Sequence, residues 1–417
     1  MEGCSMSGVK TKTAGPVVIA AGGTGGHFFP AEALADALVA RGHQVVLMTD
    51  ARAGKRTTGV FATADQYVLP GAGVAGRGPV RALRGGLALL RGARQARAIM
   101  AKIRPAAVVG FGGYPSVPPL FGARMLPRGI RPAIVLHEGN AVFGKANAFL
   151  VRFANGVALS FSQVAGLPPG TLVRVTGMPV RPAIAALVGE GYEPPADSIR
   201  LLVWGGSLGA RVFSDVVPEA LSMLPLEIRE RVQVTQQVRA EDLERVRTAY
   251  ESYGIVARLE PFFSDVASLM REAHLVIGRA GGSSVAELCV AGRPSVLVPL
   301  PVAASDEQTA NALAMQGAGA AWLIRQPSFT SDALSALLSM LFTDTGVLVA
   351  AAEAAAKMAR PDAAERLADL VGDCVHGRGL HGAGPGAYAR AGAGADQTAS
   401  IFSFPSTDTS LPQEDRS

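Results

Sequence analysis

Cysteine is scarce in this chain, which has only Cys4, Cys289 and Cys374 among its 417 residues. The number is odd, and the wide spacing matches neither a disulfide framework nor a zinc motif. This excludes a small scaffold held together by disulfides or by zinc. We therefore expect a reduced protein of the cytoplasm, with no metal site.

Long apolar runs are missing as well. No stretch approaches the ~18 uninterrupted apolar residues that a membrane-spanning helix needs. The apolar segment 16–21 is too short for the core of a signal peptide and leads into glycines with no cleavage site. With 49% hydrophobic and 18% charged residues, the chain has the composition of a globular protein and the length for two domains.

Acidic residues are absent between Asp65 and Glu138, a segment that contains eleven lysines and arginines. Residues 1–180 carry 20 basic and 6 acidic side chains, whereas residues 181–417 carry 19 and 28. This imbalance favours an anionic partner for the first half of the chain. Nucleic acid is disfavoured as that partner, because residues 66–137 hold few aromatics and no nucleic-acid-binding motif.

Short apolar runs alternate with helical patterns along the whole chain. Because these runs are apolar throughout, they predict parallel strands buried on both faces. In the first half the predicted strands are Val17–Ala20, Val45–Met48, Ala107–Gly110, Ala133–Leu136 and Val157–Ser160. In the second half they are Arg200–Trp204, Val232–Thr235, Ile255–Leu259, Leu275–Gly278, Ser295–Val298 and Ala320–Ile324.

The pattern stops over residues 176–199 and restarts with a new strand and a new glycine-rich turn. We therefore predict an α/β protein with two Rossmann-like, doubly wound parallel-sheet domains, at residues 15–180 and 181–360. The segments 1–14 and 377–417 are polar or rich in small residues, and we expect both to be disordered tails.

Three turns share one pattern, in which a strand is followed by glycines and then by a helix. They are Gly22–His27, Gly112–Ser116 and Gly205–Ala210. Glycine allows a ligand to approach the backbone, and the start of a helix offers unpaired N–H groups to a phosphate. None of the turns fits the dinucleotide fingerprint or a P-loop. Each alone also fits a tight strand-to-helix turn, but their recurrence favours phosphate binding.

His27 lies at the first turn of a predicted helix, beside this proposed anion site. The positive end of the helix dipole disfavours an imidazolium there, so His27 is suited to accept a proton. A lone histidine is also compatible with a structural role. Glu138 and Asn140 in "LHEGNA" follow another predicted strand and favour a functional role for the group.

Together these segments resemble one family. The chain contains, in order, "AAGGTGGHFFP", "GFGGYPSVP", "LHEGNAV", "TGMPVRP", "WGGSLGA", "PFFSDV", "GRAGGSSVAELCVAGRPSVLVPLP" and "DEQTANA". This series resembles the MurG family of glycosyltransferases, over residues 15 to 376. Members of this family transfer N-acetylglucosamine (GlcNAc) from UDP-GlcNAc to undecaprenyl-diphosphate-linked muramyl-pentapeptide, converting lipid I into lipid II of peptidoglycan.

The resemblance implies a GT-B fold, in which two Rossmann-like domains face each other across a cleft and the last helix, here 361–376, returns to the first domain. It implies an inverting hexosyltransferase without a cofactor, and the sequence lacks the paired acidic motif of metal-dependent sugar-nucleotide transferases. The second domain is expected to bind the donor and the first domain the lipid acceptor. The protein is expected at the cytoplasmic face of the plasma membrane.

The resemblance also implies site residues. Arg181 and Ser207 are expected at the donor diphosphate, Phe263 at uracil, Glu287 at the ribose diol and Gln308 at the sugar hydroxyls. The expected donor-binding residues are Thr24, Gly25, Gly26, Asn140, Arg181, Ser207, Phe263, Gly282, Ser283, Ser284, Glu287 and Gln308. The expected acceptor-binding residues are His27, Gly113, Tyr114, Ser116 and Glu138, and His27 is the expected general base or diphosphate ligand. Glu287 also fits a helix-terminus acid, and Arg181 a hinge salt bridge.

Four positions depart from the family pattern. Gly139 replaces the glutamine of "HEQN", Met178 the asparagine of "GNPVR", Leu208 the glutamine of "GGSQGA", and Glu307 a histidine before Gln308. These departures leave open a catalytically inactive cell-wall scaffold. Another GT-B glycosyltransferase, acting on a different lipid or on a natural product, is a second alternative.

The segment 76–105 combines apolar residues three and four positions apart with flanking arginines. This pattern predicts a basic amphipathic helix that binds anionic lipids. The expected membrane-facing residues are Val80, Arg81, Leu83, Arg84, Leu87, Leu90, Arg91 and Arg94. A solvated basic face on a helix that packs on its own sheet is the alternative.

Overall fold

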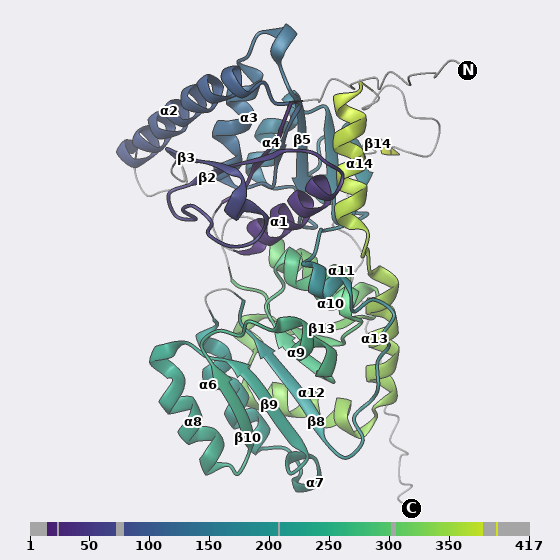
Figure 1. The fold of residues 1–417 in the computed structure, drawn as a ribbon. Coiled ribbons are helices and arrows are strands. Elements are labelled where there is room, and N and C mark those ends of the chain that lie inside the picture. Colours follow the sequence, from purple (N-terminus) through teal and green to yellow (C-terminus); the bar gives the residue numbers. More distant parts are fainter. Residues whose placement is uncertain are drawn as a thin grey trace, which may run out of the picture.

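The computed structural model describes residues 15–22, 25–71, 79–206, 209–301, 306–377 and 389–390, with the backbone alone for residues 79–83 and 389–390. The two predicted tails therefore lie almost wholly outside the described residues. Two α/β domains are stacked one above the other, and the helix α14 (Ala363–Val375) lies along the first domain (Figure 1).

The first domain contains a parallel sheet with the strand order β7-β6-β5-β4-β1-β2-β3. Its strands are β1 (Val17–Ala20), β2 (Val45–Asp50), β3 (Asp65–Leu69), β4 (Ala107–Gly110), β5 (Ala133–Glu138), β6 (Gly156–Leu159) and β7 (Leu172–Val175). The short β14 (Ala389–Arg390) pairs antiparallel with β7. All residues of β1, β2, β4 and β6 are buried, as expected for strands covered on both faces.

Helices cover both faces of this sheet. α1 and α14 contribute to the core on one face, and α2 and α3 to the core on the other. The helices are α1 (Gly25–Ala40), α2 (Pro79–Ile103), α3 (Val117–Arg124) and α4 (Lys145–Leu150). The 3₁₀ turns are η1 (Val60–Thr63), η2 (Tyr114–Ser116), η3 (Arg128–Ile130) and η4 (Val151–Phe153).

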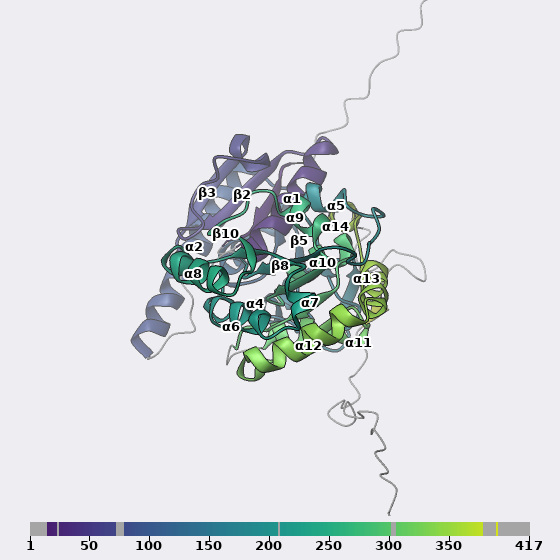
Figure 2. The same ribbon diagram turned by 90° about the horizontal axis from the view of Figure 1, so that it is seen from below.

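The second domain has a parallel six-stranded sheet with the order β10-β9-β8-β11-β12-β13, which is the order of a dinucleotide-binding domain. Its strands are β8 (Ile199–Trp204), β9 (Val232–Gln237), β10 (Val256–Glu260), β11 (Leu275–Gly278), β12 (Ser295–Leu297) and β13 (Ala321–Leu323). α6, α8 and α12 lie on one side of the sheet and α9 and α10 on the other (Figure 2).

The helices of the second domain connect these strands or follow the last of them. They are α5 (Pro182–Ala185), α6 (Arg211–Ser222), α7 (Leu226–Arg229), α8 (Leu243–Ser252), α9 (Val266–Glu272), α10 (Gly282–Ala291), α11 (Glu307–Gly317), α12 (Ser331–Thr343) and α13 (Gly346–Met358). The 3₁₀ turns are η5 (Ala240–Asp242) and η6 (Gln326–Ser328).

α14 belongs to the core of the first domain although it follows the second domain in sequence. Its residues Leu367, Leu370 and Val371 are buried with the apolar residues of α1 and β1. Two ion pairs add to this contact, Arg41–Asp369 at 2.6 Å and Arg174–Asp373 at 2.8 Å. The chain thus crosses between the domains twice, once before α5 and once before α14.

Every predicted strand overlaps an observed one, and two parallel strands were not predicted. β3 lies at the edge of the sheet and is mostly half-exposed, so its sequence is not a continuous apolar run. β7 contains Arg174, whose partner Asp373 comes from α14 and is not visible as a partner in the sequence. The first helix begins at Gly25, so Gly25, Gly26 and His27 form its first turn.

Within the described residues, no single helix is both long and apolar enough to cross a membrane. One pair of helical segments, Ser331–Thr343 and Gly346–Val375, reaches the required length and composition together but is bent by 94°. Buried residues of this pair, including Leu338, Leu348 and Leu367, belong to the cores of the two domains.

Candidate active site between the domains

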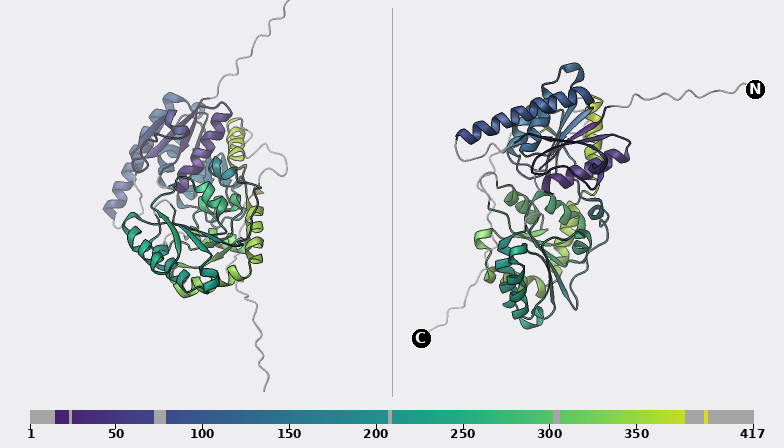
Figure 3. Two further views of the ribbon diagram at one scale, coloured as in Figure 1. Left: turned by 60° about the horizontal axis from the view of Figure 1, so that its bottom comes forward. Right: turned by 60° about the vertical axis from the view of Figure 1, so that its left-hand side comes forward.

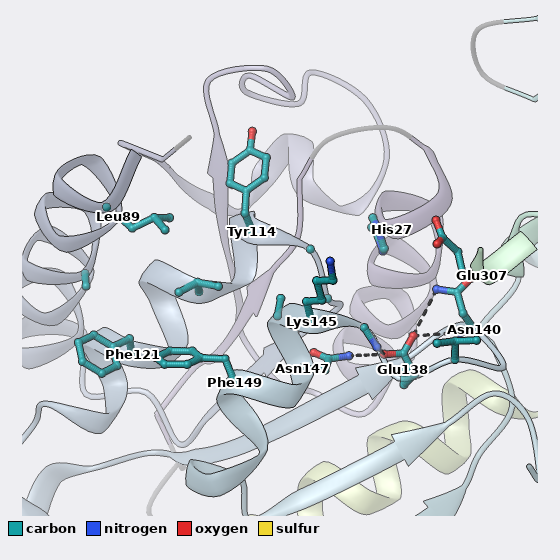
Figure 4. Close-up of a pocket in the computed structure, with 18 of the residues that line it drawn as sticks. His27, Leu89, Tyr114, Phe121, Glu138, Asn140, Lys145, Asn147, Phe149 and Glu307 are labelled. Carbon is teal, nitrogen blue, oxygen red and sulfur yellow. Dashed lines mark hydrogen bonds between the residues drawn. The ribbon is translucent and has the colours of Figure 1, made fainter. Parts of the chain in front are cut away.

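A cavity of about 730 Å³ lies at the carboxyl edge of the first sheet and reaches the second domain (Figure 4). His27, Glu138 and Asn140 line its polar end, together with Glu307 at the start of α11 in the second domain. Apolar side chains of α2, α3 and α4 line its other end. The cavity is therefore amphipathic along its length.

His27 projects into the polar end from the first turn of α1. The turn after β4 packs against its ring, since a Cβ at Gly112 or Gly113 would lie 3.8 Å from a ring atom. Burial lowers the pKa of His27 below its ordinary value of 6.5, although Glu138, the Phe111 backbone and Glu307 oppose this shift. The imidazole is therefore neutral at pH 7 and can accept a proton.

Glu138 organises the loop between β5 and α4. One carboxylate oxygen accepts from the backbone N–H of Asn140 at 3.1 Å and from its side-chain amide at 3.2 Å. The other accepts from the backbone N–H of Gly144 at 2.8 Å and from the Asn147 side chain at 2.9 Å. With both oxygens engaged, Glu138 holds the loop in shape, and its predicted contact with the acceptor stays a prediction.

The N-termini of α1 and α10 face each other across the domain boundary. A Cβ at Gly26 would lie 3.7 Å from the Ser283 hydroxyl. A Cβ at Gly282 would lie 2.2 Å from the carbonyl oxygen of Gly139, so any larger residue at position 282 would force the domains apart. Two helix N-termini in this arrangement offer N–H donors and positive dipole ends to one anionic group.

Asn311, which is fully buried on α11, joins the two domains. Its side-chain oxygen accepts from the backbone N–H of Ala141 at 2.8 Å. Its amide nitrogen donates to the Asn140 side chain and to the Ala280 carbonyl, both at 3.0 Å. Glu138, Asn140 and Asn311 thus form a continuous hydrogen-bonded chain from the first domain to the second.

Arg181 and Glu287, both predicted to bind the donor, form an ion pair with each other. The guanidinium donates to the two carboxylate oxygens at 2.8 and 2.9 Å, and it lies 4.9 Å from the centre of the Phe29 ring. Burial raises the pKa of Glu287, and Arg181 opposes that shift. The hinge salt bridge considered from the sequence is present, and the predicted donor contacts of both residues remain predictions.

Tyr114 lines the cavity, and its hydroxyl donates to the buried Asp50 at the end of β2. Burial and this hydrogen bond raise the pKa of Tyr114 to about 12, while Arg52 lies 4.5 Å from its ring centre. Ser116 differs, because it is fully buried and donates to the carbonyls of Ala20 and Gly112. Its hydroxyl fixes the turn, which argues against the predicted acceptor contact.

The chain matches two known family domains and many curated relatives. Residues 17–159 match the glycosyltransferase family 28 N-terminal domain, and residues 200–367 match the C-terminal domain of that family. A protein of Gluconobacter oxydans is 61% identical over 356 residues, which cover 85% of this chain and 98% of that protein. It is named UDP-N-acetylglucosamine–N-acetylmuramyl-(pentapeptide) pyrophosphoryl-undecaprenol N-acetylglucosamine transferase. A protein of the same name from Granulibacter bethesdensis is 55% identical, with 85% and 93% covered.

The crystal structure of Acinetobacter baumannii MurG is similar to this one, with a TM-score of 0.69 at 29% identity. The match covers 86% of this chain and 99% of that one. The chain belongs to the MurG family. The calicheamicin glycosyltransferase CalG4 shares the fold at 16% identity, with a TM-score of 0.58 and 87% and 98% of the two chains covered. The predicted family and the GT-B fold are therefore confirmed.

Other donor-binding residues predicted from the MurG family are Thr24, Ser207, Phe263 and Gln308. Thr24 and Ser207 lie outside the described residues. Phe263 is 2% exposed, so its side chain cannot stack on a base, and only a backbone contact with uracil stays a prediction. The side chain of Gln308 accepts from the Leu300 N–H at 3.0 Å, beside the cavity-lining Glu307.

Two of the departures from the MurG pattern, Gly139 and Met178, are in contact and form a single structural change. A Cβ at Gly139 would lie 2.5 Å from the terminal methyl of Met178, which is buried. Met178 therefore occupies the space that a side chain at position 139 needs. The usual glutamine and asparagine are replaced together by a glycine and a methionine that pack against each other.

Sequence reasoning missed three residues of this site. Lys145 and Asn147 follow the "HEGN" motif by five and seven residues, and Asn311 lies within the quoted "DEQTANA". Lys145 is known only from the cavity that it lines, whereas Asn147 and Asn311 act through contacts with Glu138 and Asn140, which no local pattern signals. Among the described residues, no group of three or more His, Cys, Asp or Glu side chains is arranged to hold a metal ion.

Gly139→Gln alone should destabilise the protein by about 1–3 kcal/mol, because the new side chain overlaps Met178. Met178→Asn alone should also destabilise it, because it leaves a buried amide in an apolar space. The double variant should recover at least about 1 kcal/mol relative to the sum of the two. Denaturant unfolding of all four proteins measures this coupling, and additive effects would show that the two positions are independent.

Proposed function

We propose that this protein transfers GlcNAc from UDP-GlcNAc to the muramyl 4-hydroxyl of undecaprenyl-diphosphate-linked muramyl-pentapeptide. The product is lipid II, so the protein is an inverting hexosyltransferase of peptidoglycan and cell-wall synthesis. The observation that carries this proposal is the 61% identity, over nearly the whole length of the relative, to a transferase named for this reaction. The amphipathic cavity beside the facing N-termini of α1 and α10 supports it.

In this proposal the donor diphosphate lies at the N-terminus of α10, close to Arg181. The leaving UDP gains negative charge as the anomeric bond breaks, and helix N–H groups and a guanidinium stabilise that charge. The close fit of Gly282 against the loop of the first domain brings donor and acceptor together across the boundary. Holding the two substrates in this geometry lowers the barrier, because the entropy of bringing them together is lost on binding and not in the reaction step.

His27 is suited to take the proton of the attacking hydroxyl. It lies at the polar end of the cavity, where Glu138 and Glu307 stabilise the imidazolium once it has formed. Its lowered pKa keeps it unprotonated before the reaction. We assign it as the general base, and binding of the acceptor diphosphate is the alternative role to be tested.

We further propose that the first domain rests on the cytoplasmic face of the plasma membrane, where the lipid acceptor lies. α2 extends beyond the body of that domain (Figure 3). Along it, Leu87 is 46% and Leu90 36% exposed, and Arg84, Arg91 and Arg94 are exposed nearby. The side chains of Val80, Arg81 and Leu83, also predicted for this surface, lie outside the described ones.

Transfer tests the proposed reaction directly. Purified protein should move labelled GlcNAc from UDP-GlcNAc to lipid I, and not to diacylglycerol, because the acceptor cavity has a polar end for a diphosphate-linked sugar. Chromatography of the lipid products measures transfer to lipid I and to diacylglycerol. Transfer to diacylglycerol alone would replace the substrate proposed here. UDP binding without any transfer would identify an inactive scaffold.

His27→Ala should lower kcat by roughly 10²–10⁴-fold and leave UDP affinity within about twofold, as for loss of a general base. Because the pKa of His27 lies below 6.5, wild-type kcat/KM should fall only as the pH drops below 6.5 and His27 becomes protonated. The variant should lose this acid limb. A raised KM for the acceptor with unchanged kcat would instead make His27 a diphosphate ligand, and wild-type kinetics would remove it from the site.

Replacing the exposed arginines of α2 should weaken binding to anionic vesicles at low salt by about 10²-fold, at ~1 kcal/mol for each basic side chain. The variant carries serine at Arg84, Arg91 and Arg94. A control with the same change in charge carries serine at three exposed arginines of the second domain, Arg247, Arg258 and Arg271. Cosedimentation measures both. Equal binding by the two variants would contradict a membrane surface on α2.

A further inference from the structure

The apolar end of the cavity has no role in the transfer chemistry. Its wall combines one stripe of α2 with residues of α3 and α4 (Figure 4). The main side chains are Leu89, Leu90, Val117, Phe121 and Phe149. We call this part of the cavity the apolar groove. It is continuous with the polar end at His27, since both belong to one cavity.

The absence of a side chain at Gly86 leaves space on one face of α2. Gly86, Leu89, Leu90 and Ala93 recur at the three- and four-residue spacing that places side chains on one face of a helix. A Cβ at Gly86 would meet no atom within 4 Å, so the space beside it is open. Further along the helix, Met100 on this face is fully buried in the core. The groove therefore lies where the packing of α2 on its domain gives way to open space.

The mouth of the groove exposes large apolar side chains. Leu90 is 36% and Phe149 42% exposed, and both also line the cavity. Arg152 lies 4.9 Å from the centre of the Phe149 ring, so a cation flanks this apolar opening. Exposed apolar residues gathered in this way mark a site for an apolar ligand. The mouth adjoins the surface of α2 proposed above to rest on the membrane.

Lys145 lies between the two ends of the cavity. It is exposed at the start of α4, and its side chain extends into the cavity between the Phe149 side and His27 (Figure 4). A lysine ammonium is a point charge suited to phosphate. From the domain boundary outward, the cavity thus presents an acid–base end, then a cation, then an apolar groove.

The order of these three chemical environments matches one class of molecule. A sugar linked through a diphosphate to a polyprenyl chain has its reactive hydroxyl, its anionic group and its apolar chain in the same sequence. We propose that Lys145 binds the diphosphate of the acceptor and that the apolar groove binds the first isoprene units of its lipid. This inference rests on the proposed function. A volume of about 730 Å³ is in the range of sites that enclose a medium-sized ligand.

The enzyme recognises the prenyl chain next to the diphosphate and not only the sugar and peptide, and this part of the lipid leaves the bilayer to reach the groove. A diacyl lipid places two chains and a glycerol at this position. Such a lipid fits the single groove beside Gly86 less well.

Binding measurements test the preference for a prenyl chain independently of the transfer reaction. Calorimetry compares farnesyl diphosphate, which is a soluble fifteen-carbon prenyl diphosphate, with inorganic diphosphate and with dihexanoyl phosphatidic acid. The wild-type protein should bind farnesyl diphosphate at least about tenfold more tightly than inorganic diphosphate, since burial of even two CH₂ groups suffices for that factor. It should prefer farnesyl diphosphate to the phosphatidic acid by a similar factor.

Gly86→Phe should remove this tenfold preference for the prenyl compound, because the ring fills the groove where the glycine leaves space. Gly86→Ala should retain it and thereby control for the effect of a side chain on the helix. Gln95→Phe, at an exposed position of α2 that does not line the cavity, controls for an added aromatic ring. All variants are first compared with the wild type by circular dichroism and thermal unfolding.

Lys145→Gln should lower the affinity for farnesyl diphosphate and for inorganic diphosphate alike, by about fivefold or more, because one charge-assisted contact is lost. Lys357→Gln, an exposed lysine of the second domain, should change neither affinity. Equal binding of the prenyl and inorganic diphosphates by the wild-type protein would contradict the proposal that the apolar groove binds the prenyl chain. A Gly86→Phe variant that keeps the preference for the prenyl compound would contradict it as well. Equal affinity for farnesyl diphosphate and the phosphatidic acid would contradict the specificity of the groove for prenyl chains.

The proposed prenyl groove and the proposed transferase activity can be rejected independently of each other. Loss of the prenyl preference in a protein that still makes lipid II would reject the groove and leave the transferase intact. Tight, Gly86-dependent binding of farnesyl diphosphate by a protein without transfer to lipid I would reject the transferase, and the prenyl-diphosphate site would remain.

Discussion

The contact between Gly282 and the carbonyl of Gly139 is the constraint on which the site depends. It brings the N-terminus of α10 against the loop that follows β5, and the N-terminus of α1 lies beside it at Gly26. Because position 282 has no room for a Cβ, the separation of the two domains is fixed by backbone contact at this point. Two positive helix ends then converge on one small volume, which favours an anionic ligand between them.

Polar groups around this contact are used mainly to hold one another. Glu138 organises its loop, and Asn140 and Asn311 carry that order into the second domain. Such a hydrogen-bonded chain is rigid, because any displacement costs it one of these hydrogen bonds. His27 is neutral at this polar end at pH 7, and burial is the main reason for its lowered pKa. Rigid surroundings and a neutral imidazole suit a reaction that depends on positioning.

The departures from the MurG pattern have different physical meanings. Gly139 and Met178 exchange polar groups for a compact apolar contact, so they change the packing of the loop after β5. Glu307 adds a carboxylate to the polar end of the cavity, where it favours the protonated form of His27. The first change therefore concerns the stability of the loop, and the second concerns the charge around His27.

Local sequence patterns determined the fold class, the buried strands and the glycine turns, because continuous apolar runs and glycine-to-helix turns report on nearby backbone. The motif series also determined the family, since it extends over nearly the whole chain. Tertiary structure decided the edge strands β3 and β7, the ion pair of Arg181 with Glu287, and the structural use of Ser116 and Glu138. It also decided the position of Asn311, which meets Asn140 from 171 residues away. These features depend on contacts between distant segments, and only the folded chain brings such segments together.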